Sequence, residues 1–351
     1  MTVAMTPALD QLRLHLRSKS MTVGRTCPLD YRYAASIFRG HASMTTDTLY
    51  VVGGLYGNDA ALDEVVTMFK RERETKHLVF NGDFNWFNIA PARFRRINES
   101  VLAYDAIRGN VETELGRTTV NTEAGCGCGY PDFVDDGVVE RSNAIMQRLQ
   151  TSAKLFPQLQ SDLARLPMWR RIDVGGARVT VIHGDPSSLA GWGLGIEALS
   201  AAPGVDRAVR WFEEADVDIF ACTHTCLPLL RRVGAGIVVN NGAAGMPNFS
   251  ASRYGIITRI AISPSACATP LYGVESAGVN VDALAVAYDH DRFLADFDAQ
   301  WPAGSPAAAS YRRRIVDGPD YELQQATLPA ENEPQVFMNL KPSHPASERR
   351  P

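Results

Sequence analysis

Residues 48–83 read TLYVVGGLYGNDAALDEVVTMFKRERETKHLVFNGD, and this segment has the pattern of a strand, a helix and a second strand. Its two ends, TLYVV and HLVFN, are short runs of β-branched and aromatic residues that are followed by Gly, as is typical of strands. Between them Leu62, Val65 and Phe69 recur at the spacing of one helix face. Asn58 stands just before this face, where it would cap the helix. Because the strands are apolar throughout, we expect them to be buried on both faces, as in an α/β fold.

The same alternation continues along the chain. Four more runs end in Gly, Asn, Asp or His: AYDAIRGN (103–110), VTVIHGD (179–185), VDIFACTH (217–224) and GIVVNNG (236–242). Pro203-Gly204 breaks the chain, and residues 205–215 then have the spacing of an amphipathic helix. These segments extend the α/β pattern well beyond the first unit.

The sequence pattern changes after residue 250. Three runs come one after another with no helix between them: RYGIITRIAIS (253–263), ATPLYGV (268–274) and VNVDALAVAYD (279–289). They predict antiparallel strands that complete a second sheet, so the fold class is mixed α/β (α+β). Helical spacing returns over residues 290–301.

The composition shifts divide the chain into three parts. We expect an N-terminal arm over residues 1–46, the main domain over residues 47–300, and a C-terminal extension over residues 301–351. The extension becomes polar and rich in Pro, and we expect disorder after about residue 320.

The bulk composition excludes several classes of protein. The net charge is −4 over 351 residues, which gives no basic excess for binding a nucleic-acid duplex. No apolar run approaches the ~20 residues that cross a bilayer, and the N-terminus lacks the apolar core of a signal peptide. Six Cys are far below the density of a disulfide scaffold. We therefore expect a cytoplasmic protein without a membrane or duplex partner.

The residues that follow the strands carry the candidate chemistry, because ligands of α/β sheets bind beyond the carboxyl ends of the strands. The segments concerned are Gly53-Gly54-Leu55-Tyr56, Asn81-Gly82-Asp83, Arg108-Gly109-Asn110-Val111-Glu112, His183-Gly184-Asp185 and Thr223-His224-Thr225-Cys226. Taken singly, a buried His is more often a core residue, and Asp83 could be a helix cap. Their ordered recurrence favours a metal site. One carboxylate, one amide and two imidazoles suit Mn²⁺, Fe or Zn²⁺ better than Ca²⁺ or Mg²⁺.

These ordered motifs resemble those of the calcineurin-like metallophosphoesterases, and in particular of the small bacterial phosphodiesterases. The resemblance covers roughly residues 48–289 and includes the spacer Gly57-Asn58-Asp59-Ala60-Ala61-Leu62. It implies a four-layer αββα sandwich of two mixed β-sheets. It also implies a divalent metal cofactor. The ligands that it assigns to the second metal are Asp83, Asn110, His183 and His224.

The sequence departs from the family pattern at four positions. Gly54 and Tyr56 stand where the family has the Asp and His of the first metal, and Cys226 stands where it has the last His. Val111 replaces the His that assists the leaving group. Only the bridging Asp83 is then left of the first metal's set. The number of metal ions per chain, one or two, therefore remains open.

Two interpretations of the first metal position stay open. Tyr56 and Cys226 could bind a metal as anions, and Cys27, Cys126, Cys128 and Cys222 could add sulfur ligands. The alternative is that these cysteines are buried, inert small hydrophobes, since C-x-C is a poor spacing for zinc.

Two further residues are candidate catalytic groups. Glu112 stands beside Val111 and could protonate the leaving group. Arg108 could bind a substrate phosphate as a fork donor, although a surface ion pair is an equal alternative. The run Arg312-Arg313-Arg314 could face an anionic substrate or solvent.

Three hypotheses on function follow. The first is a metal-dependent hydrolase of a phosphoester, acting as phosphodiesterase or phosphomonoesterase on a phosphorylated small molecule or nucleotide. The second is a catalytically inactive descendant that binds a nucleotide or a protein partner. The third is a redox or metal-handling role built on Cys126, Cys128 and Cys226.

Overall fold

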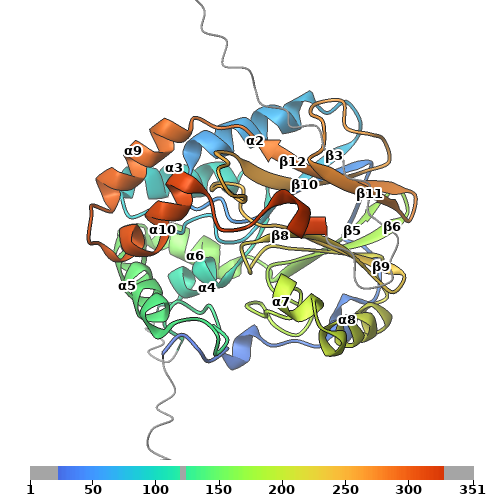
Figure 1. Ribbon diagram of the computed structural model, residues 1–351, viewed down its shortest axis with the longest axis horizontal. Coiled ribbons are helices and arrows are strands. Elements are labelled where there is room, and N and C mark those ends of the chain that lie inside the picture. The colour runs from blue at the N-terminus through green and yellow to red at the C-terminus, as the bar shows by residue number, and fades with distance from the viewer. Residues whose placement is uncertain (1–22, 119–123, 328–351) are drawn as a thin grey trace, which may run out of the picture.

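The computed structural model describes residues 23–118 and 124–327, and the expected fold is confirmed: two six-stranded mixed sheets face each other, with helices on their outer faces (Figure 1). The first sheet has the strand order β11-β12-β10-β2-β3-β4. Its strands are β2 (Thr48–Val52), β3 (Lys76–Asn81), β4 (Asp105–Ile107), β10 (Gly255–Ala261), β11 (Tyr272–Ser276) and β12 (Val279–Val286). The second sheet has the order β1-β5-β6-β7-β9-β8. Its strands are β1 (Met44–Thr46), β5 (Trp169–Val174), β6 (Ala177–Ile182), β7 (Ile219–Cys222), β8 (Pro228–Val233) and β9 (Gly236–Asn241).

The helices come from all parts of the described chain. They are α2 (Asp59–Arg71), α3 (Pro91–Val101), α4 (Asn110–Gly116), α5 (Asp136–Ala153), α6 (Pro157–Arg165), α7 (Ile196–Leu199), α8 (Ala202–Ala215), α9 (His290–Gln300) and α10 (Pro306–Asp317). Short 3₁₀ turns lie at η1 (Leu29–Tyr31), η2 (Ala35–Phe38) and η3 (Leu323–Thr327).

The alternation of side chains along β2 shows how the layers form. Leu49 and Val51 belong to the core between the two sheets. Tyr50 and Val52 point the other way and pack with residues of the helices that cover the first sheet. Because both faces are covered, every residue of β2 is buried, as its apolar run predicts.

Local sequence signals explain where elements begin. The side chain of Asn58 accepts a hydrogen bond from the backbone N of Ala61 at 3.0 Å, so the expected cap of α2 is confirmed. Helix α8 begins at Ala202, three residues before the predicted start, because Pro203 is tolerated in the first turn of a helix.

The three strands predicted after residue 250 are present and antiparallel. They pair in the order β11, β12 and β10, and β10 then pairs with β2. They therefore extend the sheet that contains β2, β3 and β4, while the other sheet is built from β1 and β5–β9.

The C-terminal part of the described chain packs on the domain. Ala307 and Ile315 of α10 are buried in the same core as the helices of the first sheet. Tyr321 and Ala326 are buried against the core between the sheets, so the folded chain extends past the residue at which disorder was expected. The rest of the predicted disordered tail, residues 328–351, and residues 1–22 of the arm lie outside the described residues.

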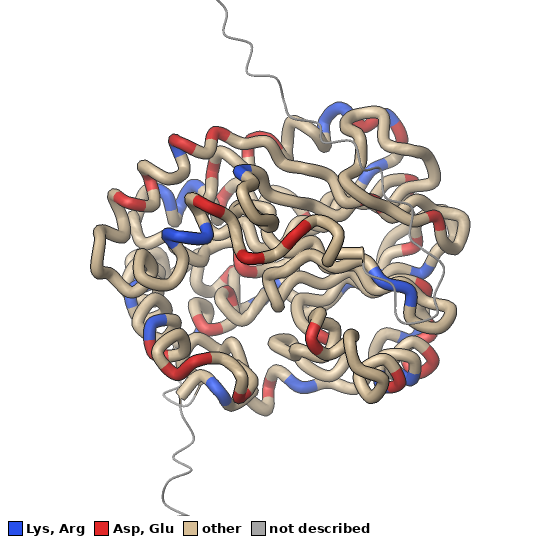
Figure 2. Tube along the Cα trace, viewed as in Figure 1, with Lys and Arg blue, Asp and Glu red and all other residues tan. Residues whose placement is uncertain are grey.

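Charged residues of both signs are interspersed around the molecule (Figure 2). Among the described helices, none combines the length and the apolar character that crossing a bilayer requires.

Candidate metal centre

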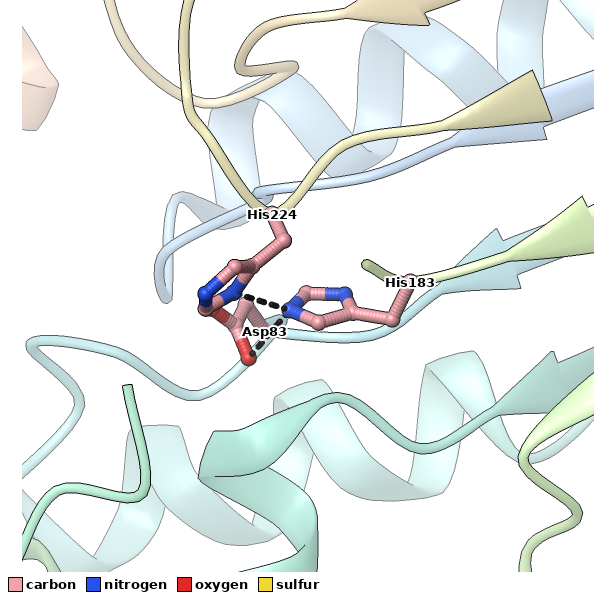
Figure 3. A group of neighbouring side chains, drawn as sticks. All are labelled: Asp83, His183 and His224. Atoms are coloured by element: carbon pink, nitrogen blue, oxygen red, sulfur yellow. Dashed lines mark hydrogen bonds and ion pairs between the residues drawn. The ribbon is translucent and has the colours of Figure 1, made fainter. Parts of the chain in front are cut away.

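Three buried side chains meet where strands of the two sheets end. Asp83 follows β3, His183 follows β6 and His224 follows β7 (Figure 3). One ligand atom of each lies within 4.8 Å of the other two. Within residues 23–118 and 124–327 this is the group of His, Cys, Asp or Glu side chains that could hold a metal ion.

His183 Nε2 lies at the middle of the group. It is 3.4 Å from Asp83 Oδ1, 3.2 Å from His224 Nδ1 and 3.2 Å from Asn110 Oδ1. Asn110 opens α4 just after β4, so it arrives from a second strand end of the first sheet. The structure thus brings together all four residues that the family resemblance assigned to the second metal.

The far side of each ring and amide is fixed by a backbone carbonyl. His183 Nδ1 lies 2.9 Å from the carbonyl of Asn81, and His224 Nε2 lies 3.0 Å from the carbonyl of Cys128. Asn110 donates from Nδ2 to the carbonyl of Cys126 at 3.0 Å. A carbonyl only accepts, so these three nitrogens carry the hydrogens.

Each of the atoms that converge therefore points a lone pair toward the others. They are a carboxylate oxygen of Asp83, an amide oxygen of Asn110 and one unprotonated nitrogen from each of two neutral imidazoles. Four acceptors facing one another in a buried space repel unless a cation lies between them. This donor set fits a divalent ion of the Mn, Fe or Zn kind.

Without an ion, a proton would have to serve as that cation. Burial opposes charge on His183, but the neighbouring Asp83 outweighs it and raises the pKa of His183. Burial would likewise raise the pKa of Asp83, but His183 lowers it. Burial and then the charge on His183 lower the pKa of His224 to about 4. The neighbouring carboxylate thus favours a proton on His183, whereas His224 keeps its lone pair at neutral pH.

The backbone around Asp83 is shaped for close approach. Asp83 itself has a left-handed φ of 53°. A Cβ on Gly109 would lie 2.3 Å from Asp83 Oδ1 and 2.7 Å from the ring of His183, so only Gly fits there. The left-handed backbone of Asp83 lies at the group of ligands, as is common at functional sites.

Glu112 lies behind the loop that carries Asp83. Its side chain is buried and accepts hydrogen bonds from the backbone N of Asp83 at 2.7 Å, of Phe84 at 3.1 Å and of Gly109 at 3.2 Å. Burial and the charge on Asp83 raise the pKa of Glu112 to about 7. It is not among the residues that line the cavity beside the ligands, so the structure places this predicted proton donor in a position to hold the loop.

Arg108 and Cys27 lie away from the ligands. The guanidinium of Arg108 donates from Nη1 to the carbonyl of Ala164 at 2.9 Å, and Arg108 does not line the cavity beside the ligands. Cys27 Sγ lies 2.8 Å from Ser188 Oγ, in a small cluster with Tyr31. The structure brings neither of them to the group.

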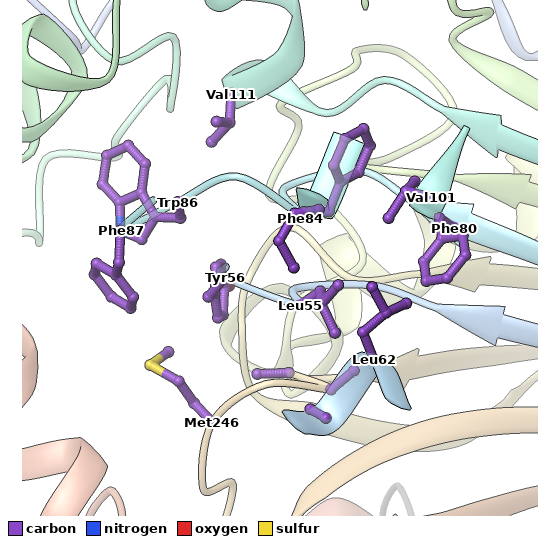
Figure 4. Packing of buried hydrophobic residues seen from close by; sticks show 14 of the residues in the cluster. Leu55, Tyr56, Leu62, Phe80, Phe84, Trp86, Phe87, Val101, Val111 and Met246 are labelled. Atoms are coloured by element: carbon purple, nitrogen blue, oxygen red, sulfur yellow. The ribbon is translucent and has the colours of Figure 1, made fainter. Parts of the chain in front are cut away.

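The first metal position is filled by side chains. Tyr56 Oη lies 2.6 Å from Cys226 Sγ, and both residues have left-handed backbone. A Cβ on Gly54 would lie 3.0 Å from the Tyr56 ring, so this ring occupies the space next to the missing carboxylate. Figure 4 shows Tyr56 near Phe87 and Met246 in the core.

Tyr56 and Cys226 are held in their neutral forms in this arrangement. Burial and then Cys226 raise the pKa of Tyr56 well above its usual value. Burial also raises the pKa of Cys226, against the opposing charge of Arg314. Both residues line the cavity, but Cys226 Sγ does not belong to the described metal-ligand group.

The other cysteines are spread over the core. Cys128 lines the cavity, and its sulfur lies 3.5 Å from Asn110 Nδ2. Cys126 is fully buried, and Cys222 packs with the residues beneath α8, on the opposite face of its sheet. The described group of metal ligands contains no sulfur, so the geometry does not gather a thiolate site.

A cavity of about 280 Å³ opens beside the ligands. Asp83, Asn110 and His224 line it, together with Val111. Five Trp and Tyr side chains also line it: Tyr56, Trp86, Tyr130, Trp192 and Tyr311. A larger cavity of about 460 Å³ shares Trp192 but contains none of the four converging ligands.

Two arginines complete the cavity beside the ligands. Arg141 comes from α5, and Arg314 comes from α10 in the C-terminal extension. Sequence reasoning did not find Arg141, and it left the basic run 312–314 undecided. No local pattern marks either residue, because the packing of α5 against α10 brings them to the cavity.

Comparison with known proteins shows the family and the fold of this chain. A family model described as the calcineurin-like phosphoesterase superfamily domain matches residues 49–261, a span that includes all four ligands. No curated protein matches the sequence of the chain.

Several solved structures are similar. A hypothetical protein from Pyrococcus horikoshii OT3 has a TM-score of 0.53 at 14% identity, over 79% of this chain and 100% of the other. A metallophosphoesterase from Sphaerobacter thermophilus has a TM-score of 0.49 at 18% identity, over 78% and 100%. An archaeal phosphodiesterase has a TM-score of 0.33 at 9% identity, over 68% and 99%. At such identity, the likeness to the Pyrococcus protein shows the fold alone.

Proposed function

This chain belongs to the calcineurin-like phosphoesterase superfamily, and we propose that it is a metal-dependent hydrolase of a small phosphoester. One observation carries the proposal: four lone-pair atoms converge on one buried point beside a cavity. The residues that would hold the ion are Asp83, Asn110, His183 and His224.

The charges of the cavity support an anionic substrate. Arg141 and Arg314 line it, and Asp83 is the carboxylate among its described lining residues. With Asp83 engaged by a divalent ion, the cavity presents an excess of positive charge. A phosphoester is the anion that such a combination binds well.

The reaction adds water across the ester bond. A water oxygen forms a bond to phosphorus, the bond from phosphorus to the ester oxygen breaks, and the protons of water end on the phosphate and the released alcohol. When bound, a divalent ion supplies Lewis-acid polarisation of the phosphoryl group and lowers the pKa of water. The chain's own part is to orient the ligands, through the carbonyls of Asn81 and Cys128 behind the two imidazoles.

The leaving group has no imidazole at the position that the family uses. Val111 lines the cavity there and cannot donate a proton. Substrates whose alcohol leaves as a stable anion are therefore favoured, because they need little help from an acid. The Trp and Tyr rings that line the cavity also suit an aryl or nucleobase group.

The test is hydrolysis by the full chain loaded with Mn²⁺. We expect turnover of p-nitrophenyl phosphate or of bis(p-nitrophenyl) phosphate, and much slower turnover of an alkyl phosphate. His183→Ala should lose both turnover and bound metal. His77→Ala is the matched control, since His77 pairs with Asp105 3.2 Å away at a different place in the sheet. A His183→Ala variant that hydrolyses the ester as fast as the parent would overturn the proposal, and so would a metal-loaded parent without turnover of either ester.

A further inference from the structure

We infer that the guanidinium of Arg314 replaces the missing first metal ion as the positive charge that binds the substrate phosphate. The inference rests on the proposed function and adds a substrate-contacting catalytic residue to it. It also predicts that the enzyme works with one metal ion per chain.

The first metal position does not fit an ion. Gly54 has no side chain to offer, and the ring of Tyr56 fills the adjoining space at 3.0 Å from where a Cβ on Gly54 would stand. Tyr56 Oη is engaged with Cys226 Sγ at 2.6 Å. Within the described residues, the group of possible metal ligands consists of Asp83 and two histidines. The histidines belong to the other metal position, so only the bridging Asp83 would be left to hold an ion at the first.

Arg314 is anchored at this same position by the backbone. Its Nη2 donates to the carbonyl of Cys226 at 2.7 Å, and its Nε donates to the carbonyl of Pro247 at 3.2 Å. Cys226 is the residue that stands in place of the last metal ligand. The charge of Arg314 is thus held beside the position where the sequence has lost a metal ligand.

One nitrogen of this guanidinium is available to a ligand. Arg314 is half-buried and lines the cavity, and for its Nη1 the structure records no hydrogen bond to any described residue. Because Nε and Nη2 are held by backbone carbonyls, the planar guanidinium also fixes the direction of Nη1. Little conformational entropy is therefore lost when an oxygen of a phosphate binds to Nη1. A preorganised charge of this kind is what stabilises the charge that develops in phosphoryl transfer.

The neighbours of Arg314 are used differently. Arg312 pairs with Asp298 at 2.8 Å, and Arg313 pairs with Asp320 at 3.0 Å, both at exposed positions. Of the basic run on α10, Arg314 is the residue that reaches the cavity. Arg141 stands near it, because Arg141 Nε donates to Ser310 Oγ of α10 at 2.6 Å.

The experiment measures phosphate binding separately from turnover. Inorganic phosphate is titrated calorimetrically into the full chain loaded with Mn²⁺, and bound Mn²⁺ is counted by elemental mass spectrometry. The variants are Arg314→Met and Arg314→Lys, with Arg313→Met as the matched control of exposed charge. Thermal unfolding of each variant shows whether the fold is kept.

We expect one Mn²⁺ per chain in the parent and in every variant. Arg314→Met should weaken phosphate binding by about 10- to 100-fold, the loss expected for a hydrogen bond to a charged group. Arg314→Lys should retain part of the affinity, and Arg313→Met all of it. With p-nitrophenyl phosphate, Arg314→Met should lower kcat by about 100-fold or more, and added guanidinium ion should restore part of that loss.

Two results would overturn the inference: Arg314→Met that binds phosphate as the parent does, or two tightly bound ions in the parent. If Arg314→Met fails to fold, Arg314→Gln takes its place, because Gln keeps a hydrogen-bond donor but has no charge. Phosphate affinity equal to that of the parent in Arg314→Gln would equally overturn the inference, since the charge would then not be what binds. Failure of the proposed function looks different. In that case the parent binds phosphate through Arg314 but hydrolyses neither ester.

Discussion

Replacing Glu112 by Gln tests whether this residue holds the loop of Asp83 or donates a proton. One carboxylate oxygen accepts from the backbone N of Asp83 at 2.7 Å and of Gly109 at 3.2 Å. The other accepts from the backbone N of Phe84 at 3.1 Å and of Asn85 at 3.3 Å. An amide keeps one acceptor oxygen and turns an NH₂ group toward two N–H donors.

The cost of this change can be worked from the contacts. Two buried N–H groups lose their acceptor at about 1–3 kcal/mol each, so Glu112→Gln should lower the free energy of unfolding by about 2–6 kcal/mol. This is a large part of the ~5–15 kcal/mol that stabilises a typical domain. Because the loop also positions Asp83, the affinity for Mn²⁺ should fall by about 10- to 100-fold.

The assay is urea unfolding of the metal-free chain, followed by Mn²⁺ titration of the folded variant. Glu140→Gln is the matched control, since Glu140 is exposed on α5. The reasoning is refuted if Glu112→Gln unfolds at the same urea concentration as the parent, binds Mn²⁺ equally well and loses only turnover. That result would make Glu112 the proton donor that the sequence first indicated.

Three further predictions concern metal, pH and the core. Mn²⁺ at 100 times its Kd should raise the free energy of unfolding by about 2.7 kcal/mol, and the Tm should rise with it. His183→Ala should abolish this rise in Tm. An equal rise in the variant would contradict the assigned ligands. Burial raises the pKa of Asp282 to about 6, so the folded state binds more protons than the unfolded state between pH 4 and 6, and stability falls as the pH rises through this window. Asp282→Asn should therefore stabilise the chain by about 2 kcal/mol at pH 8 and by about a third of that at pH 4.5, as measured by urea unfolding at both values. Equal effects at the two pH values would refute the assignment. Glu72 accepts a hydrogen bond from Arg259 Nε at 2.7 Å, so Arg259→Met leaves a buried carboxylate without its partner. This variant should lower the free energy of unfolding by about 3–5 kcal/mol in the same assay. A loss below about 1 kcal/mol would show that water reaches this pair.

The sequence predicted the layered α/β fold and most of the candidate metal ligands. Apolar runs such as residues 48–52 are long enough to show strands buried on both faces, and Asn58 marks the start of α2. Asp83, His183 and His224 stand just after strands. The parallel strands β6 and β7 bring the two histidines to a common edge, and the facing of the two sheets brings the end of β3 with Asp83 to the same place. Their convergence therefore follows from local sequence and the geometry of sheets.

The role of Glu112 needed the tertiary structure. Its position beside Val111 made it a candidate acid, but a sequence does not show which backbone N–H groups a carboxylate will meet. In the fold its oxygens meet the loop of Asp83, 28 and 29 residues earlier in the chain. The same neighbourhood in sequence is thus compatible with two different chemical roles.

Tertiary structure alone also decided what replaces the lost metal position. Tyr56 and Cys226 are 170 residues apart, and Arg314 lies 88 residues beyond Cys226. No periodicity or spacing connects them, because their contact depends on how α10 packs against α5 and on left-handed backbone at two non-glycine residues. The ends of strands follow from a local pattern that repeats along the chain. The contacts among Tyr56, Cys226 and Arg314 form only when distant elements pack together, so no sequence pattern predicts them.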